Sequence, residues 1–383
     1  MKLGIIGYGS RMNDMQKLMK ELDSGYKLVA VTDIRNEEIK KQLASEGNDV
    51  NEISFFESAD EMLAKVELDG VFIGTRCSLH TQMAIKVILK GIPLLLEKPV
   101  ATSMEDYKKL SEVYYQNPKA SENVQVSFPL RVTPLVDIVK EIVASGKIGT
   151  IEHVQAVNNV PYGGVYFHNW YRDENETGGL FLQKATHDFD YINAILGIKP
   201  VSICAMTSKQ IFKGDKPANL KCKDCNEAET CMESPQNLHF YTNSIATGEY
   251  CSFAKDTGNE DSGSALIAYE TGMHVSYSQN FFARKTAAKR GASFFGYKGT
   301  VEFDWYTNEV KVYMHHSPKV EIHKLDSSNM SHSGGDAVLA KNFIEMMKGR
   351  EQPVAPLDAG LLSVLMCLKA RESARTSTFQ EIR

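Results

Sequence analysis

Residues 2–12, KLGIIGYGSRM, have the pattern of a short apolar strand that enters a glycine turn and then a helix. Gly7 and Gly9 allow a tight turn and a close approach of the backbone to a pyrophosphate at the positive end of the following helix. The third glycine of the usual dinucleotide-binding pattern is replaced by Met12. The motif alone is therefore weak, and an ordinary strand–helix turn explains it equally well.

A second predicted strand, residues 28–32, ends in Asp33 and strengthens the interpretation of the first turn. A carboxylate at this place can accept both ribose hydroxyls of NAD and would repel the 2′-phosphate of NADP. Arg35 follows two residues later and could contact a phosphate or stack on adenine. We expect NAD rather than NADP, with Ser10 and Arg11 of the first turn also contacting the cofactor.

Short β-rich segments alternate with helical patterns up to about residue 128. The predicted strands are 3–6, 28–32, 70–73, 94–96 and 124–128, and the predicted helices are 14–22, 37–46, 79–89 and 104–115. Such alternation predicts a doubly wound parallel sheet that binds ligands at the carboxyl ends of its strands. Residues 1–128 are therefore predicted to form an α/β Rossmann domain.

The composition is that of an ordinary soluble globular protein. The chain has 383 residues, of which 43% are hydrophobic and 24% charged, and a net charge of −5; a chain of this length usually forms two domains. Without a basic block or a long apolar run we expect neither a nucleic-acid nor a membrane partner. A strand beginning at residue 2 leaves no room for a signal peptide, and an odd number of cysteines, seven, favours reduced thiols in the cytoplasm.

Polar residues follow two further predicted strands. Thr75 follows the strand 70–73, His80 lies in the first turn of the next helix, and Glu97-Lys98-Pro99 follows the strand 94–96. A lysine at the carboxyl end of a buried parallel strand points into the cofactor crevice, where desolvation favours proton transfer near neutral pH. Thr75, His80, Glu97 and Lys98 are therefore expected at the cofactor. A surface lysine at a strand end is the alternative for Lys98.

The chain resembles the Gfo/Idh/MocA oxidoreductases, the glucose–fructose oxidoreductase and inositol dehydrogenase family. The resemblance rests on GIIGYG, VTD, VFIGT followed by His80, and LLLEKPVATS, of which the EKP stretch is the most specific. It continues through SFPLRVTPLVDIVKEIVASGKIGTIEHV, GGLFLQKATHDFD, GYKGTVEFD and SHSGGDAVLAKNFIEMM, nearly to the end of the chain. The resemblance implies that Lys98 and His187 act beside the nicotinamide. It also implies a Lys98–Pro99 bond that is often cis, although most X–Pro bonds are trans.

From about residue 151 the pattern changes to longer alternating strands. Strands are predicted at 151–157, 201–207, 265–269, 274–279, 292–296, 300–303, 309–314 and 320–324, and helices at 336–348 and 359–373. They predict an α+β domain over residues 129–383 with a large open, mostly antiparallel sheet and a cysteine-rich insertion around 215–255. The final helices are expected to brace the domain junction. One sheet face is expected to pack on helices and the other to be solvated or to pair with another subunit, giving a homodimer or homotetramer.

The stretch 178–192, GGLFLQKATHDFDYI, combines polar residues with many apolar ones on one helix. Gln183 and His187 are four residues apart, so they are expected to share a helix face. Several relatives carry aspartate where Gln183 stands; glutamine cannot act as a base, but it can bind a hydroxyl or the carboxamide. Lys184 either supplies a positive charge to the site or pairs with Asp188 on the outer face.

A substrate site is expected around the same helix. Trp170 and Arg172 precede the double glycine, as a W-x-R does in many relatives, and an indole and a guanidinium suit a polyhydroxylated ring. Arg131 lies where the resemblance places an arginine before a helix. With Gln183 and Lys184, these residues are expected to contact a small sugar or polyol.

We therefore expect an enzyme that oxidises or reduces a secondary alcohol or ketone of a sugar or cyclic polyol, with proton transfer by Lys98 and His187. For His187, the alternative is a core histidine satisfied by Asp190. Two other functions remain open. One is NAD-assisted cleavage of a glycoside through transient oxidation at C3, as in some relatives. The other is a non-catalytic regulator that senses NAD and sugars.

The sequence LKCKDCNEAETC places Cys222, Cys225 and Cys231 together, and Cys251 follows one hairpin later. This spacing is typical of a four-cysteine structural zinc site. Zinc would supply folding energy that side-chain burial in a polar segment cannot. An iron–sulfur cluster on the same ligands and unrelated free thiols are the alternatives.

Overall fold

The computed structural model describes residues 1–238, 248–326 and 331–383, so residues 239–247 of the predicted insertion lie outside the described part. The chain divides into two compact units. The first contains residues 1–133 with 329–364, and the second contains residues 134–328 with 365–383. None of the helices in the described ranges combines the length and the apolar run that crossing a bilayer requires.

The first unit is built on a six-stranded parallel sheet in the order β3-β2-β1-β4-β5-β6. Its strands are β1 (Lys2–Ile6), β2 (Lys27–Thr32), β3 (Ser54–Phe56), β4 (Gly70–Ile73), β5 (Leu94–Leu96) and β6 (Val124–Val126). Strands β4, β5 and β6 are buried along their whole length, as expected for a parallel sheet with both faces covered. This confirms the predicted doubly wound sheet. Strand β3 was not expected, and only Phe56 of its three residues is buried.

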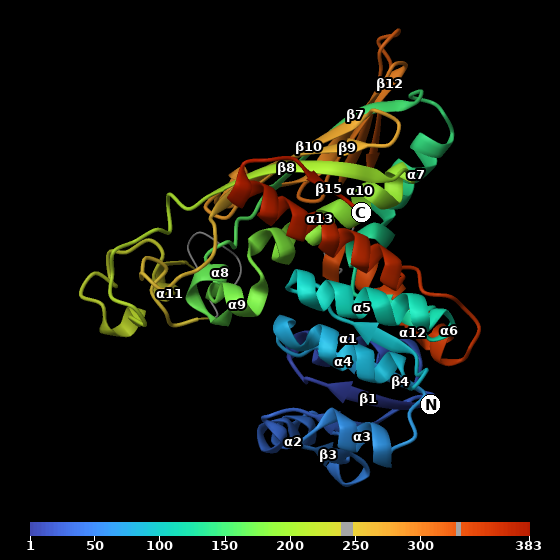
Figure 1. The fold of residues 1–383 in the computed structure, drawn as a ribbon, viewed down its shortest axis with the longest axis vertical. Helices are drawn as coiled ribbons and strands as arrows, with labels where there is room; N and C mark the ends of the chain where they lie inside the picture. The colour runs from blue at the N-terminus through green and yellow to red at the C-terminus, as the bar shows by residue number, and fades with distance from the viewer. Residues whose placement is uncertain (239–247, 327–330) are drawn as a thin grey trace. The chain divides into compact units, whose positions relative to one another are not determined.

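Seven helices of the described residues accompany this sheet (Figure 1). They are α1 (Ser10–Leu22), α2 (Asn36–Ser45), α3 (Ala59–Lys65), α4 (His80–Ile88), α5 (Met104–Gln116), α6 (Pro118–Ser121) and α12 (Gly335–Met347). The Ser103 hydroxyl caps α5 by accepting from the Asp106 N–H. Helix α12 comes from late in the chain and packs against α1, and the rings of Phe72 and Phe343 lie 5.3 Å apart in the core.

The second unit contains a nine-stranded sheet in the order β14-β13-β12-β11-β7-β10-β9-β8-β15. Its strands are β7 (Ile151–Asn159), β8 (Pro200–Ser208), β9 (Ser262–Tyr269), β10 (His274–Asn280), β11 (Lys289–Gly296), β12 (Gly299–Asp304), β13 (Glu309–Met314), β14 (Val320–Lys324) and β15 (Gln380–Glu381). Only the pairing of β7 with β10 is parallel. The large, mostly antiparallel sheet is therefore confirmed.

Helices cover one face of this sheet. The helices of the second unit are α7 (Pro134–Ala144), α8 (Val165–His168), α9 (Glu174–Thr177), α10 (Thr186–Leu196) and α11 (Pro235–Leu238), and α13 (Leu357–Thr376) runs from the first unit into the second. Helix α7 packs on β12 and β13. Tyr191 of α10 packs edge-on against Trp305, with ring centroids 4.9 Å apart.

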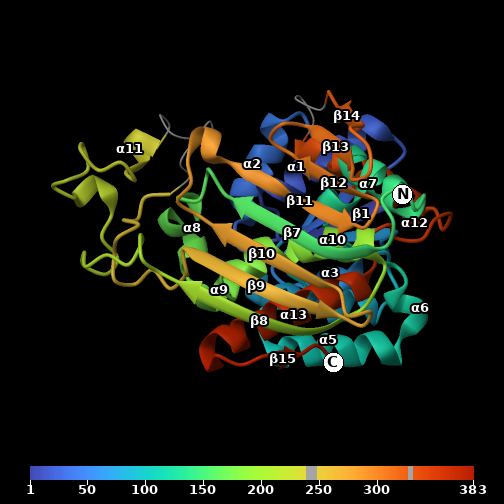
Figure 2. The same ribbon diagram turned by 90° about the horizontal axis from the view of Figure 1, so that it is seen from above.

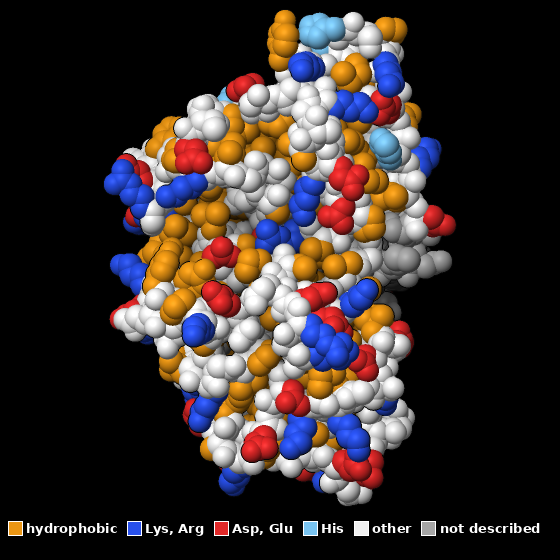
Figure 3. All heavy atoms as spheres, turned by 90° about the vertical axis from the view of Figure 1, so that its right-hand side faces the viewer, with side chains coloured by type: hydrophobic (Ala, Val, Ile, Leu, Met, Phe, Trp, Pro, Cys, Tyr) orange, Lys and Arg blue, Asp and Glu red, His pale blue; other side chains and the backbone are white. Residues whose placement is uncertain are grey.

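The other face of the sheet is open, and Figure 2 looks onto it, with α10 behind the strands. A groove of about 750 Å³ runs across it, lined among others by Cys204, Met206, Ser264 and Leu266. Along β9 the buried and exposed residues alternate, as expected for a sheet with one covered face. On the face of the molecule seen in Figure 3, basic and acidic side chains are interspersed.

Candidate active site

The turn between β1 and α1 has the geometry that a dinucleotide requires. Gly7 has a φ of +82°, and a Cβ on it would lie 2.5 Å from the Thr75 backbone nitrogen, so no other residue fits there. The Gly7 N–H donates to the Thr32 carbonyl at 2.8 Å. Gly9 is the N-cap of α1 and leaves its backbone uncovered by a side chain. The turn therefore presents backbone at a helix N-terminus, which suits a pyrophosphate.

Met12 occupies the place of the third glycine and is fully buried. A Cβ on Gly74 would lie 2.3 Å from the Met12 Cγ. The close packing of α1 on the sheet is therefore made possible by a glycine after β4 rather than by one in α1. Met12 in place of the third glycine does not distort the turn. The sequence signal that the required glycine stands after β4 instead was Gly74 in VFIGT.

Asp33 lies directly after β2, at the carboxyl end of the parallel sheet. Its carboxylate accepts from the Tyr8 N–H at 2.8 Å and from the Arg35 N–H at 2.9 Å. The Arg35 Nε lies 3.3 Å from the same carboxylate. The acid and the arginine, which as separate residues favour different cofactors, thus form one pair beside the glycine turn.

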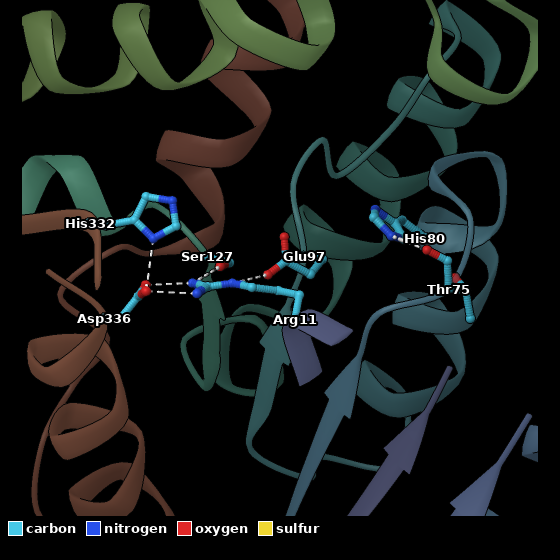
Figure 4. A network of polar contacts seen from close by, with 7 residues as sticks. All are labelled: Arg11, Thr75, His80, Glu97, Ser127, His332 and Asp336. Atoms are coloured by element: carbon cyan, nitrogen blue, oxygen red, sulfur yellow. Dashed lines mark hydrogen bonds and ion pairs between the residues drawn. The ribbon is translucent and has the colours of Figure 1, made fainter. Parts of the chain in front are cut away.

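Figure 4 shows that Arg11 is held by acceptors of its own chain. Its Nε donates to Glu97 at 3.1 Å, its two terminal nitrogens donate to the two oxygens of Asp336 at 2.8 and 2.6 Å, and Nη2 also donates to Ser127 at 3.2 Å. His332 donates from Nδ1 to Asp336 at 2.8 Å. Burial alone would raise the pKa of Asp336, but the bonds from His332 and Arg11 outweigh it and hold that pKa well below its usual range.

His80 connects two turns at the carboxyl ends of β4 and β5. It is 1% exposed, with Nδ1 2.8 Å from the Pro99 carbonyl and Nε2 3.2 Å from the Thr75 carbonyl. Burial lowers the pKa of His80, and both ring nitrogens face backbone carbonyl oxygens. His80 thus braces the Thr75 turn against the Lys98-Pro99 turn, whose peptide bond is cis. Lys98 itself is half-buried.

Lys184 of the second unit is a buried cation that contacts tyrosine side chains. It is 7% exposed, and its Nζ donates to the Tyr162 hydroxyl at 2.6 Å. The ammonium also lies over the rings of Tyr162 and Tyr166, at 4.5 and 5.1 Å from their centroids. Burial lowers the pKa of Lys184. Its contacts are with tyrosines, and the charges of Arg290 and Asp188 also act on it.

The alternative in which Lys184 pairs with Asp188 on an outer face is wrong. Asp188 is fully buried and forms an ion pair with Arg290 at 2.8 Å. The reason is a π-helical segment, Phe181–Ala185, directly before α10. A π-helix bonds residues five apart, so faces assigned from α-helical spacing do not continue from Lys184 to Asp188.

The other predicted substrate residues differ in how they are held. The buried Gln183 donates to the Thr177 carbonyl at 3.0 Å, and His187 is 9% exposed at the start of α10. The Trp170 ring stacks on Tyr171 with centroids 3.9 Å apart. Arg172 donates to Asp256 at 2.6 Å, which ties the Trp170 loop to the insertion.

Arg131 belongs to the first unit rather than to this group. It is half-buried in the helical turn Pro129–Val132, which packs against α12.

The predicted zinc site is not supported. In the described ranges, no group of three or more His, Cys, Asp or Glu side chains is arranged to hold a metal ion, so the structure supports neither zinc nor an iron–sulfur cluster. Burial, and then the neighbouring thiols of Cys251, Cys231 and Cys225, raise the pKa of Cys222 to about 12.

The expectation of a metal assumed that the insertion buries little apolar surface, and residues 215–233 indeed contain no buried residue. Apolar packing occurs at the two ends of the insertion. Phe212 belongs to a buried cluster with Phe167 and Phe281, against which Phe253 packs.

Within the first unit, the structure brings Gly7, Asp33, Thr75, Glu97 and Arg11 to the carboxyl edge of one sheet, as predicted for a cofactor site. Within the second unit, it joins Lys184 to a tyrosine that the sequence did not single out as its partner.

Arg290 and the ionic role of Asp336 were also missed. Arg290 lies on the same face of β11 as the buried Ala292 and Phe294. A cation in that row of the sequence pattern is a signal that could have found it.

Family models match most of the chain. The model described as "Oxidoreductase family, NAD-binding Rossmann fold" matches residues 1–126, and that of the "GFO/IDH/MocA C-terminal domain" matches residues 136–302. The chain belongs to the GFO/IDH/MocA family. It is an NAD-binding oxidoreductase of that family, which confirms the resemblance drawn from the EKP and glycine-turn motifs.

Known relatives of this family are similar at low identity. The putative oxidoreductase YteT of Bacillus subtilis is 24% identical over 322 residues, 74% of each chain. The scyllo-inositol 2-dehydrogenase (NAD(+)) of Bacillus subtilis is 27% identical over 215 residues, 52% of this chain and 54% of that protein. The structure of levoglucosan dehydrogenase in complex with NADH and levoglucosan has a TM-score of 0.77 at 15% identity and covers 100% of this chain and 99% of that one. At this identity the likeness shows the fold.

Proposed function

We propose that this oxidoreductase uses NAD to oxidise a secondary alcohol of a sugar or cyclic polyol, or to reduce the corresponding ketone. The observation that carries the proposal is the undistorted glycine turn of Gly7 next to Asp33 and the Glu97-Lys98 segment, all at the carboxyl ends of one parallel sheet. The names of an inositol dehydrogenase and a levoglucosan dehydrogenase among similar proteins support the substrate class.

The residues of this chain have separate tasks in the proposed reaction. NAD, when bound, accepts the hydride from the carbon that bears the hydroxyl. Backbone N–H groups at Gly9 hold the pyrophosphate, and Asp33 accepts from the ribose hydroxyls. Lys98 polarises the alcohol oxygen or relays its proton, and His187 takes the proton as the carbonyl forms. In the reverse direction the same two residues return the proton to the ketone oxygen.

Substrate binding is proposed to involve Trp170, Gln183, Lys184 and Arg131. An indole face packs against C–H groups of a sugar ring, while amide and cationic groups bind its hydroxyls. Arg172 is proposed to act through the loop that it ties to Asp256.

The open face of the nine-stranded sheet is proposed to pair two or four copies of the chain. Met206 and Leu266 are 78% and 51% exposed on it, and exposed apolar side chains that gather on one face mark interaction sites.

Turnover of a panel of alcohols tests the proposal. The purified protein is incubated with NAD and myo-inositol, scyllo-inositol, levoglucosan or glucose, and NADH formation is followed by absorbance. Lys98→Met and His187→Ala are each expected to lower kcat by about 10²–10⁴-fold, or ~3–5 kcal/mol, while NADH binding is retained. Wild-type turnover in either variant contradicts the assigned roles. Release of an aglycone without net NADH indicates glycoside cleavage, and binding without any turnover indicates a sensor.

A further inference from the structure

Arg11 was expected to bind the cofactor, but its guanidinium is committed to other groups. A guanidinium has five N–H donors, and its contacts with Glu97, Asp336 and Ser127 already use both terminal nitrogens and Nε. The pair with Asp336 is bidentate, which is the strongest and most directional contact that an arginine makes. Little donor capacity is left for a phosphate.

The acceptors come from three different elements of the first unit (Figure 4). Glu97 follows β5 and directly precedes Lys98, Ser127 follows β6, and Asp336 lies in the first turn of α12. Arg11 itself lies in the first turn of α1, two residues after Gly9. One side chain therefore fixes the start of the cofactor helix relative to the segment that carries Lys98.

The chain before α12 adopts a costly conformation that contributes to this contact. His332 and Ser333 have φ angles of 44° and 51°, and Gly334 has a φ of 91°. Left-handed conformations at non-glycine residues are unfavourable and persist where the surroundings impose them. Here they turn the chain so that His332 donates to Asp336, whose carboxylate also accepts from Arg11. Asp336 is 2% exposed.

We propose that Arg11 is a positioning residue for Lys98, and that Asp336, supported by His332, holds Arg11 in this role. By binding the carboxylate of Glu97, Arg11 keeps that charge away from the neighbouring ammonium of Lys98. Without Arg11, Glu97 is able to rotate towards Lys98, which favours the protonated amine and slows its participation in proton transfer. The inference rests on the proposed function of Lys98, but its contacts lie entirely within the first unit.

The test measures the reactivity of Lys98 directly and needs no substrate. Arg11→Met, Arg11→Lys and Asp336→Asn are compared with Lys17→Met, a control on the same helix whose partner is Glu46. Each protein is treated with acetic anhydride over a range of pH, and acetylation of Lys98 is quantified by peptide mass spectrometry. The affinity for NADH is measured by its fluorescence and the stability by thermal unfolding.

Arg11→Met and Asp336→Asn are expected to slow Lys98 acetylation by about threefold, because a smaller fraction of the amine is then unprotonated and able to react. The dissociation constant of NADH is expected to stay within about threefold of wild type, and Arg11→Lys is expected to restore part of the acetylation rate. Lys17→Met should change neither quantity. If Arg11→Met does not fold, Arg11→Lys and Asp336→Asn still decide the question.

A loss of NADH affinity of more than roughly tenfold with unchanged Lys98 reactivity would show that Arg11 binds the cofactor and would overturn the inference. Unchanged reactivity together with unchanged NADH affinity overturns it as well, because the contact would then be purely structural. Failure of the proposed function has a different signature: no alcohol is oxidised, yet Lys98 reactivity still depends on Arg11.

Discussion

The buried carboxylate of Asp188 provides the sharpest prediction for the second unit. Asp188 is fully buried and accepts three hydrogen bonds, from Arg290 Nε at 2.9 Å, from Asn158 at 2.8 Å and from Tyr277 at 2.8 Å. The Arg290 Nη2 also lies 2.8 Å from the same carboxylate as an ion pair. In Asp188→Asn, the N–H donors of the new amide face the donors of Arg290, Asn158 and Tyr277, so acceptors for these groups are lost. The buried guanidinium of Arg290 also loses its counter-ion.

The expected loss of stability follows from the loss of the counter-ion of Arg290. Removing one partner of a buried ion pair costs about 3–5 kcal/mol, because the other charge stays buried without compensation. The asparagine keeps the volume of the side chain and one acceptor oxygen, so we expect the lower end, about 3 kcal/mol. Replacing both partners, as in Asp188→Leu with Arg290→Met, removes the uncompensated charge and should recover more than half of the loss.

Unfolding in urea, followed by tryptophan fluorescence, measures the effect. The two tryptophans, Trp170 and Trp305, both lie in the second unit, and the Trp305 ring lies 5.9 Å from the Arg290 guanidinium, so the signal reports on the unit that contains the mutation. Glu309→Gln is the matched control, because its lysine partners Lys311 and Lys324 lie on the surface of the same sheet. It should leave the midpoint unchanged. A loss of unfolding free energy below about 1 kcal/mol in Asp188→Asn would refute the reasoning. So would additive effects of Asp188→Leu and Arg290→Met in the double variant.

Three further predictions concern the lysine of the second unit and the cofactor turn. Burial lowers the pKa of Lys184, so at a pH between its folded and unfolded pKa the unfolded chain binds more protons, and the stability of the wild type rises with pH. Lys184→Met lacks this rise. Urea unfolding at increasing pH should therefore show the variant becoming less stable relative to wild type. In Gly9→Ala the new Cβ would meet only the Gly74 carbonyl oxygen, at 3.8 Å. This substitution should leave the thermal midpoint nearly unchanged but weaken NADH binding by roughly tenfold, whereas Gly7→Ala should destabilise the fold. Equal NADH affinity in Gly9→Ala and wild type contradicts a pyrophosphate at this turn. Asp33→Ser should increase the ratio of NADP to NAD affinity in fluorescence titrations, because it removes the charge that repels a 2′-phosphate, and an unchanged ratio argues against a ribose contact by Asp33.

The sequence by itself determined most of the longer elements and the sheet types of both units, because periodicity and turn chemistry are local properties. The strand at residues 309–314 was placed correctly at both ends. The helix that begins at Met104 was placed correctly at its start. The glycine turn and Asp33 similarly indicated a dinucleotide site, since backbone conformation and chain distance suffice to recognise it. Among the described residues the predicted zinc site is not supported, because cysteine spacing alone does not fix how the side chains are arranged in space.

Only the tertiary structure decided which charges meet. Arg11 binds Asp336, which is 325 residues away, and Asp188 binds Arg290, which is 102 residues away. Both pairs form because the fold removes these groups from water. In the interior a charge needs a partner of opposite sign, and the packing decides which residue is near enough to be that partner. The same holds for Lys184, whose face is set by a π-helical segment that side-chain spacing does not reveal. Local pattern thus specified the backbone and the cofactor turn, while the partners of the buried charges followed from packing between residues distant in sequence.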